Sequence, residues 1–168
     1  NARFGQPSLN IVNGNPAIAY IGKTNELRYV RASNANGSAW NTPVWVDSPT
    51  NYLMQDSLFV ADGRPAVITR VKEGAGYNEP FLFLRAHDAD GTAWGDYAFI
   101  GATDSPEVWV EGFSCAVIDG YPSVAYVNTD DYKIYYRRAI YPDGSAWFEE
   151  GVPVTGLFSG GYLSLAEI

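Results

Sequence analysis

The chain has few of the residues from which metal sites and nucleophilic triads are built. Its 168 residues include one cysteine, Cys115, and one histidine, His87. A single cysteine excludes an intrachain disulfide framework and any thiolate metal cluster. A single histidine excludes a multi-histidine metal site and leaves a Ser-His-Asp triad with only one candidate base.

Basic charge and long apolar runs are also scarce. Only 3 of the 11 basic residues are lysine, and the formal net charge is −8. Such a surface repels phosphate backbones and anionic lipids, which disfavours nucleic acid and membrane surfaces as partners. No apolar run approaches the roughly 20 residues that a transmembrane helix requires. The chain begins at Asn1 without a leader, which is typical of a processed product or a fragment.

What the chain does contain is apolar and aromatic material. Hydrophobic residues make up 46% of it, aromatic residues 15% and charged residues only 18%. Disordered chains have the opposite balance, with low hydrophobicity and high charge. We therefore expect a packed globular domain.

Three ordered motifs recur three times along the chain. The most regular runs from an arginine to a tryptophan nine positions later, as RASNANGSAW, RAHDADGTAW and RAIYPDGSAW. Ahead of it stand NGNPAIAY, DGRPAVIT and DGYPSVAY, and ahead of those stand SLNIV, SLFVA and SCAVI. Self-similarity at a spacing of about 50 residues is the mark of a repeat architecture.

Each copy predicts four short antiparallel strands. The serine-led run ends at Asn-Gly or Asp-Gly, which favours a two-residue hairpin. A proline then opens the second strand, where a missing N–H is tolerated. The third strand leads through a second hairpin to the tryptophan, which we expect to start an outer fourth strand. Because no segment shows a sustained helical period, the predicted fold class is all-β.

The leading serines divide a single repeat domain into units of residues 8–56, 57–113 and 114–163. A partial fourth unit, 164–168, reads SLAEI and copies the first strand. Four-stranded units of about 40–50 residues are typical of β-propeller blades. A β-trefoil is the alternative, although it leaves no place for a fourth first strand. Three blades are too few for a closed ring, so we expect a second copy of the chain, giving six blades, or the rest of a longer chain to complete it.

The motif series resembles a repeat found in large secreted bacterial proteins. It consists of Ser-Leu, Asn-Gly-x-Pro-Ala-Ile-x-Tyr, Leu-x-Tyr-x-Arg-Ala and Asp-x-x-Gly-x-x-Trp, and it covers nearly the whole chain. The resemblance implies propeller blades and an extracellular or cell-surface location, without an assigned activity. The hairpin is also similar to the Asp-box of sialidases, but it has one residue more between the first Asp and Gly. Asn34 and Tyr141 replace Asp88 in the other two copies, so this likeness concerns architecture only.

Residues that recur in every unit are expected to serve the fold. The three arginines suggest a sialidase-like clamp on a carboxylate. Their recurrence favours instead a pairing with the neighbouring hairpin, and the recurrent tryptophans favour packing between blades. The residues assigned to the structural repeat are Arg31, Trp40, Arg85, Asp90, Trp94, Arg138, Asp143 and Trp147.

The remaining chemically suggestive residues have a structural interpretation as well. Asp88 and Asp90 have the spacing that opens a calcium loop, but the other copies lack the first carboxylate. We expect these side chains to stabilise the turn, keep calcium as the alternative, and assign no cofactor and no metal. Cys115 takes a slot that is leucine in the other copies, which predicts a core position. His87 takes a slot that accepts serine and isoleucine, which predicts a surface or rim position.

Function is expected on the unrepeated loops, because loops carry sites on a repeated scaffold. The loops after the second and fourth strands open on the face opposite the repeated hairpins. They combine aromatic rings with carboxylates, a set suited to holding sugars, unless the rings only pack the loops. Asp56 falls in these loops, and the candidate ligand-binding residues are Trp109, Glu111, Tyr77, Lys72, Tyr52, Tyr132, Asp131 and Tyr162.

These observations favour a non-catalytic extracellular binding module of carbohydrate-binding type. They favour a non-enzyme because no spacing singles out a catalytic residue. One alternative is a sialidase-like glycosidase or a polysaccharide lyase fragment, which needs two carboxylates at a defined separation or a tyrosine nucleophile with acidic support. The other alternative is a structural repeat without a ligand.

Overall fold

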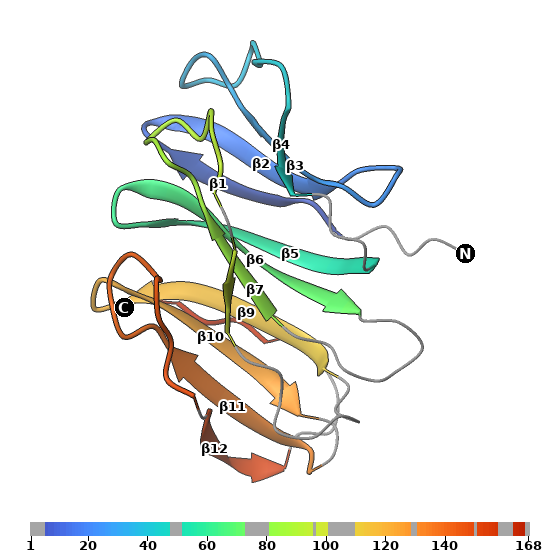
Figure 1. Cartoon of the computed structure of the whole chain (residues 1–168), viewed down its shortest axis with the longest axis vertical. Helices are drawn as coiled ribbons and strands as arrows, with labels where there is room; N and C mark the ends of the chain where they lie inside the picture. Colours follow the sequence, from blue (N-terminus) through green and yellow to red (C-terminus); the bar gives the residue numbers. More distant parts are fainter. Residues whose placement is uncertain are drawn as a thin grey trace.

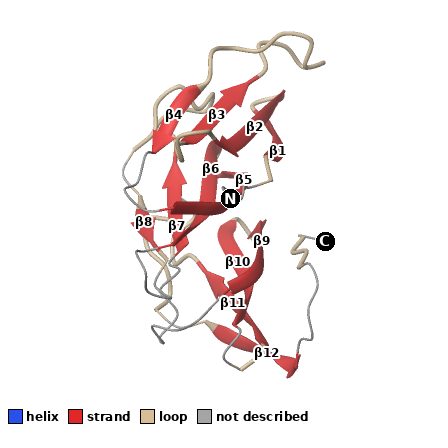
Figure 2. Ribbon diagram, turned by 90° about the vertical axis from the view of Figure 1, so that its right-hand side faces the viewer, coloured by secondary structure: helices blue, strands red, loops and turns tan. Residues whose placement is uncertain are grey.

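The structure is a computed structural model that describes residues 6–47, 52–72, 81–95, 97–100, 110–128, 131–149, 151–157 and 163–166. For residues 52, 54, 55, 72, 110, 111 and 155–157 it describes the backbone alone. The described residues form three four-stranded antiparallel sheets (Figures 1 and 2). Among them there is no helix of the length and apolarity needed to cross a membrane.

Each sheet consists of four strands that are consecutive in the chain. The first contains β1 (Ser8–Val12), β2 (Asn15–Ile21), β3 (Leu27–Arg31) and β4 (Val44–Asp47). The second contains β5 (Tyr52–Ala61), β6 (Arg64–Lys72), β7 (Phe81–Arg85) and β8 (Ala98–Phe99). The third contains β9 (Val110–Ile118), β10 (Tyr121–Asn128), β11 (Lys133–Arg138) and β12 (Val152–Leu157). We call these sheets the first, second and third blades.

The first hairpin of each blade has the predicted tight turn. Asn13 and Gly14 have φ of 43° and 79°, and the paired aspartate and glycine of the other two blades also have positive φ. Two successive positive φ values define the type I′ turn, whose twist matches that of the flanking strands. The register therefore pairs the residues on either side of the turn, such as Val12 with Asn15.

The fourth strands begin later than the sequence predicts. Trp40, Trp94 and Trp147 each form an isolated bridge to an alanine after the third strand. Each indole Nε1 donates to the carbonyl of the glycine three residues earlier, at 3.0, 3.0 and 3.1 Å. This bond folds the indole back over its own hairpin, so the tryptophan closes the turn and the fourth strand starts further along the chain.

The first strands of the second and third blades begin earlier than predicted. β5 starts at Tyr52 and β9 at Val110, ahead of their leading serines. An irregular register between Leu53 and Gln55 lets β5 continue its pairing with β6 beyond Asp56. Residues 52–56 and 110–112 therefore lie in strands of the second and third blades rather than in the predicted loops.

The blades pack face to face through two apolar clusters. Leu58 and Val67 of the second blade lie in the cluster shared with the first blade. Phe59 and Ile68 lie in the cluster shared with the third blade. Because neighbouring residues of a strand point to opposite faces, one sheet contributes to both clusters. Separate four-stranded sheets packed in this way are the blades of a β-propeller, as the sequence predicts, and not a β-trefoil.

The leading serines form hydrogen bonds between blades. The backbone N–H of Leu58 donates to Ser8 Oγ at 2.8 Å. The backbone N–H of Leu165 donates in the same way to Ser114 Oγ at 2.9 Å. Leu165 belongs to the SLAEI copy, so this segment contacts the third blade as the first strand of a following blade would.

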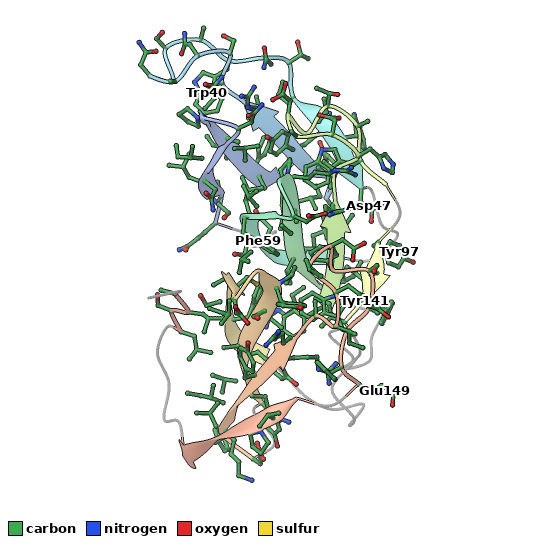
Figure 3. All side chains as sticks on the ribbon, turned by 90° about the vertical axis from the view of Figure 1, so that its left-hand side faces the viewer. Trp40, Asp47, Phe59, Tyr97, Tyr141 and Glu149 are labelled. Atoms are coloured by element: carbon green, nitrogen blue, oxygen red, sulfur yellow. The ribbon has the colours of Figure 1, made fainter. Side chains whose placement is uncertain are left out.

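One face of the first blade is open. Leu9 and Ile11 are 67% and 56% exposed there. Trp147 is 8% exposed and packs against Phe83 of the second blade, with ring centroids 5.7 Å apart. Trp40 is 42% exposed and lies at one end of the molecule (Figure 3). No blade precedes it within the described residues, and this accounts for the difference between the two tryptophans.

We predict that Trp147→Ala lowers the free energy of unfolding by about 3–5 kcal/mol, because it leaves a cavity between two blades. Trp40→Ala is the matched control, and it should lower the free energy by about 1 kcal/mol or less, because its ring faces solvent. Urea unfolding of both variants measures the difference. Equal losses would show that packing between blades is not what the tryptophan provides.

Candidate functional site

Asp56 is a carboxyl group enclosed in the middle of β5, four residues from the end of the strand that adjoins the loops. It lies on the same face of the strand as Leu58 and Val60, which pack toward the first blade. Its side chain is 5% exposed, and both carboxyl oxygens are buried without a hydrogen-bond partner among the described residues. Burial raises the pKa of Asp56 to about 7, because an apolar environment disfavours the charged form. The carboxyl is therefore protonated through the mildly acidic range.

Two carboxylates at the loop end are in the opposite state. Glu26 Oε2 accepts hydrogen bonds from the Thr24 hydroxyl at 2.5 Å and the Thr24 N–H at 2.9 Å, and these bonds lower its pKa. Partial burial raises the pKa of Asp131, but its bonds outweigh that effect and lower the pKa overall. They come from Lys133 Nζ at 3.0 Å and the Tyr135 hydroxyl at 2.9 Å. The chain thus has a protonated carboxyl inside β5 and ionised carboxylates at the loop end.

Tyr132 projects from the same turn as Asp131. Its φ is 53° and its side chain is 56% exposed. A bulky residue with positive φ is an outlier that costs backbone energy, and such outliers cluster at functional sites. The first blade has Asn25 at this position, with φ of 68°, and its Oδ1 accepts a hydrogen bond from Leu53 N–H at 2.9 Å. Tyr132 instead offers an exposed aromatic ring.

Only two of the eight candidate ligand-binding side chains can be placed. Trp109, Tyr77 and Tyr162 lie outside the described residues. Tyr52, Lys72 and Glu111 are corrected from loop to strand, at the ends of β5, β6 and β9, because those strands extend further than predicted. Tyr132 and Asp131, which are neighbours in the sequence, are the two whose side chains the structure describes, on the turn before β11.

Asp56 lies in a strand, whereas the sequence predicts a loop there and does not single this residue out. The signal was present, since Asp56 stands one residue before Ser57, where the third unit has Phe113. Both residues are buried, at 5% and 6% exposure. An aspartate at a position that buries phenylalanine in another copy of the repeat is a feature that the sequence offers.

The recurrent arginines bind within the scaffold. Arg31 donates to the carbonyls of Val12 and Asn13 at 2.9 and 2.7 Å, and its Nη1 lies 3.3 Å from Asp90 Oδ1 in the hairpin of the second blade. Arg85 pairs with Asp62 at 2.9 Å. Since these arginines belong to different blades and have local partners, they do not form one carboxylate clamp.

Arg138 and Asp143 are also held locally. The Arg138 guanidinium stacks over the Tyr121 ring, with 4.0 Å from its carbon to the ring centroid. Asp143 accepts a hydrogen bond from Ser145 N–H at 3.0 Å, and bonds to Ser145 lower its pKa. Arg138 therefore packs on the first residue of β10, directly after the first hairpin of the third blade. Asp143 stabilises the second hairpin, in which it lies.

The Asp88 carboxylate serves its own hairpin. It accepts hydrogen bonds from Asp90 N–H at 2.9 Å, Thr92 N–H and hydroxyl at 3.1 and 2.9 Å, and Ala93 N–H at 3.1 Å. Partial burial raises its pKa, but these bonds lower it overall. Asp90 meanwhile accepts from Asn13 Nδ2 at 2.8 Å. Among the described residues, no group of three or more potential ligands is placed to hold a metal ion.

Cys115 and His87 lie where their slots in the repeat suggest. Cys115 packs against the cluster between the second and third blades, and burial raises the pKa of its thiol. A thiol held in the protonated form is a poor nucleophile. His87 is exposed on the hairpin side of the second blade.

Comparison with known proteins identifies the fold but no family. No family model matches the chain, and no curated protein matches its sequence. Among solved structures, it is similar to the endo-arabinase of Bacteroides thetaiotaomicron, with a TM-score of 0.64 at 11% identity over 92% of this chain and 57% of that one. It is also similar to the xyloglucan-locus protein GH43B of Bacteroides ovatus, with a TM-score of 0.59 at 20% identity over 91% of this chain and 29% of that one.

A third similar structure is a polysaccharide lyase of family PL25, an ulvan lyase, with a TM-score of 0.53 at 9% identity over 94% of this chain and 42% of that one. At these identities the likeness concerns the fold, which is that of propeller blades. The chain spans about a third to just over half the length of these three proteins.

We predict that the stability of the chain falls as pH rises because of Asp56. Its pKa is 3.8 in the unfolded chain and about 7 in the fold. Folding therefore takes up a proton between these values, and the free energy of unfolding falls by about 4 kcal/mol from pH 4 to pH 8 through this group alone. Asp56→Asn should remove that fall and make the variant more stable than the parent at pH 8.

The control variant is Asp131→Asn, since the pKa of Asp131 is lowered in the fold. Its contribution is present at neutral pH and lost as pH falls, so this variant should gain nothing at pH 8. Urea unfolding at pH 4, 6 and 8 measures all three proteins. A parent and an Asp56→Asn variant with parallel pH profiles would contradict the raised pKa.

Proposed function

We propose that this chain forms three blades of a carbohydrate-active β-propeller of the glycosidase type, with the glycan at the loop ends of the blades. The observation that carries the proposal is the enclosed, protonated Asp56 in the middle of β5, on a chain that also has the ionised Glu26 and Asp131 at the loop ends of the first and third blades. Acid-base cleavage of a glycosidic bond uses one carboxyl that holds a proton and one that is ionised. Carboxyls whose environments drive their pKa values apart provide that pair of states.

Because Asp56 is enclosed, it can donate a proton to a glycan only if its side chain moves. Its oxygens face the first blade, so contact with a sugar requires the side chain to turn toward the loop end. Turning breaks no hydrogen bond to a described residue, because Asp56 has no such bond. The buried carboxyl also opposes folding above pH 7, and costly groups of this kind are typical of functional sites.

Similar structures support the carbohydrate class. Two of them are named as GH43 or endo-arabinase proteins and one as a polysaccharide lyase, and this chain matches each over about nine-tenths of its length. Polysaccharides of this kind occur outside the cell, so the proposal includes an extracellular or cell-surface location.

Non-catalytic glycan binding is the second candidate, and a different observation favours it. Glu26 and Asp131 are already bonded to neighbouring side chains, which suits fixed acceptors for sugar hydroxyls. The exposed ring of Tyr132 beside Asp131 is suited to stacking on a sugar face.

We predict that arabinan, galactan, xyloglucan or ulvan releases reducing ends in the presence of the protein. Asp56→Asn should lower the rate by about 100-fold or more, as expected when a proton donor is lost. Tyr132→Ala should weaken glycan binding, and Tyr141→Ala is its matched control. Tyr141 is equally exposed, at 56%, but lies on a repeated hairpin at the opposite end of the blades.

The outcomes separate the candidates. Binding that Tyr132→Ala weakens, without release of reducing ends, would favour the non-catalytic module. Neither binding nor release across the panel would contradict both candidates. Equal effects of the two tyrosine variants would place the ligand away from the loop end.

We also propose that further blades cover the open face of the first blade. The neighbouring junctions define what a covering blade must offer, namely a serine hydroxyl for the N–H of Leu9 and an aromatic ring for Trp40. Such a blade comes from a second copy of the chain, completing six blades, or from the rest of a longer chain.

We predict that the chain by itself associates into a species of about twice its 18.4 kDa mass. Leu9→Asp should prevent the association, because it places a charge in the junction. Light scattering over a wide concentration range measures the mass. A monomer at every concentration would exclude the second copy and leave blades of a longer chain as the cover.

A further inference from the structure

A pocket opens between the second and third blades on the hairpin side, away from the loop end. Its volume is 210 Å³. Arg64 at the start of β6, Arg85 at the end of β7 and His87 line it from the second blade. Asp143 and Ser145 line it from the hairpin of the third blade. Two arginines and the only histidine therefore meet in one place on a chain with a net charge of −8.

Arg64 and His87 depart from the repeat in a way that leaves their side chains unengaged. The first blade has Asn15 in place of Arg64, and its Nδ2 donates to the carbonyl of Ala32 at 2.9 Å. It has Ser33 in place of His87, and the Ser33 hydroxyl bonds within its own hairpin. The side chains of Arg64 and His87 form no hydrogen bond or ion pair with any described residue.

Gly95 lies directly against the imidazole ring of His87. A Cβ atom built on Gly95 would lie 2.6 Å from the imidazole, so a side chain at this position would displace the ring. The other units have Asn41 and Phe148 at the position of Gly95, and neither has a histidine in the hairpin. The second unit therefore combines a histidine with the glycine that makes room for it, beside an arginine that no other unit has at that position.

The two arginines and the carboxylates of Asp62 and Asp143 balance in charge, but the two arginines are not equally engaged. Arg85 pairs with Asp62 at 2.9 Å. Asp143 is held by Ser145, with a further contribution from the positive charge of Arg85. Arg64 has no carboxylate partner among the described residues, and the His87 imidazole adds a second free nitrogen donor. The donors of Arg64 and His87 are therefore left for a ligand group that offers acceptor oxygens, and a negative charge on that group strengthens its bonds to Arg64.

We propose that this pocket binds a single anionic group, a carboxylate or a sulfate ester, presented by a saccharide. The arginine fork can donate to two oxygens of either group, and His87 supplies a further donor. Pockets for drug-sized ligands measure about 300–1,000 Å³, so this smaller one fits a single substituent or one sugar unit. The anion site stands on the pocket residues alone, whereas its assignment to a saccharide rests on the proposed function.

The test is calorimetric titration of the whole chain with four probes. Galacturonic acid carries the carboxylate, galactose 6-sulfate carries the sulfate ester, galactose is the neutral sugar, and acetate is the carboxylate without a sugar. We expect binding of one or both anionic sugars and none of galactose. Acetate binding as tight as galacturonic acid binding would retain the anion site and remove the saccharide, independently of any activity at the loop end.

Arg64→Asn and His87→Ser introduce the residues that the first blade has at these positions, so both variants should fold. Arg64→Asn should weaken binding of the anionic sugar about tenfold or more, as expected for loss of a charge-assisted bond. His87→Ser should weaken it less. Arg28→Asn is the control of equal charge change, because Arg28 stacks on Trp45 in the first blade, outside the pocket.

An unchanged melting temperature separates loss of binding from loss of fold. The proposal is overturned if none of the anionic probes binds, if galactose binds as well as galacturonic acid, or if Arg28→Asn weakens binding as much as Arg64→Asn does.

Discussion

The docking of each hairpin on the preceding blade is the contact on which the rest of the structure depends. The three blades share no strand, so side chains hold them together. At each junction an aromatic ring of one blade packs closely against a hairpin glycine of the next blade. A Cβ atom on Gly91 would lie 2.5 Å from the Tyr29 ring, and Gly91 has φ of 75°. The Tyr29 hydroxyl then donates to the carbonyl of Asp90 at 3.1 Å. Phe83 meets Gly144 in the same way at the next junction.

This constraint explains why the repeat was readable from the sequence. The Asn-Gly and Asp-Gly turns, the glycine of the second hairpin and the tryptophan each satisfy a local requirement, so they recur with fixed spacing. The limits of the strands were less predictable, because they depend on pairing partners rather than on residue type. Trp94 looks like a strand residue by composition, yet its bond to Gly91 at 3.0 Å holds it in the turn. β5 runs past Asp56 because an irregular register continues its pairing with β6.

The residues of the candidate site also divide into those that a local sequence pattern predicts and those that depend on their surroundings in the fold. Tyr132 and Asp131 could be named from the sequence, since an aromatic residue beside a carboxylate in an unrepeated loop is a local pattern. Asp56 and the Arg64 pocket could not, because their properties come from what surrounds them. Asp56 is neutral because its burial in the fold disfavours the charged form, and Arg64 has no carboxylate partner among the described residues, where Asp62 pairs with Arg85. In a repeat protein, a residue that differs in type from its equivalents in the other units can still be found from the sequence. Asp56 in place of Phe113 and Arg64 in place of Asn15 are examples.

The functional account depends on the protonation state of one side chain. A propeller that acts on glycans through acid-base chemistry needs a carboxyl that keeps its proton near neutrality, and the blade junction provides the apolar surroundings for it. The most direct measurement is a carbon-13 NMR titration of the Asp56 carboxyl in the folded protein, assigned by its loss in Asp56→Asn. The account predicts a midpoint near 7. A midpoint near the ordinary value of 3.8 would contradict it.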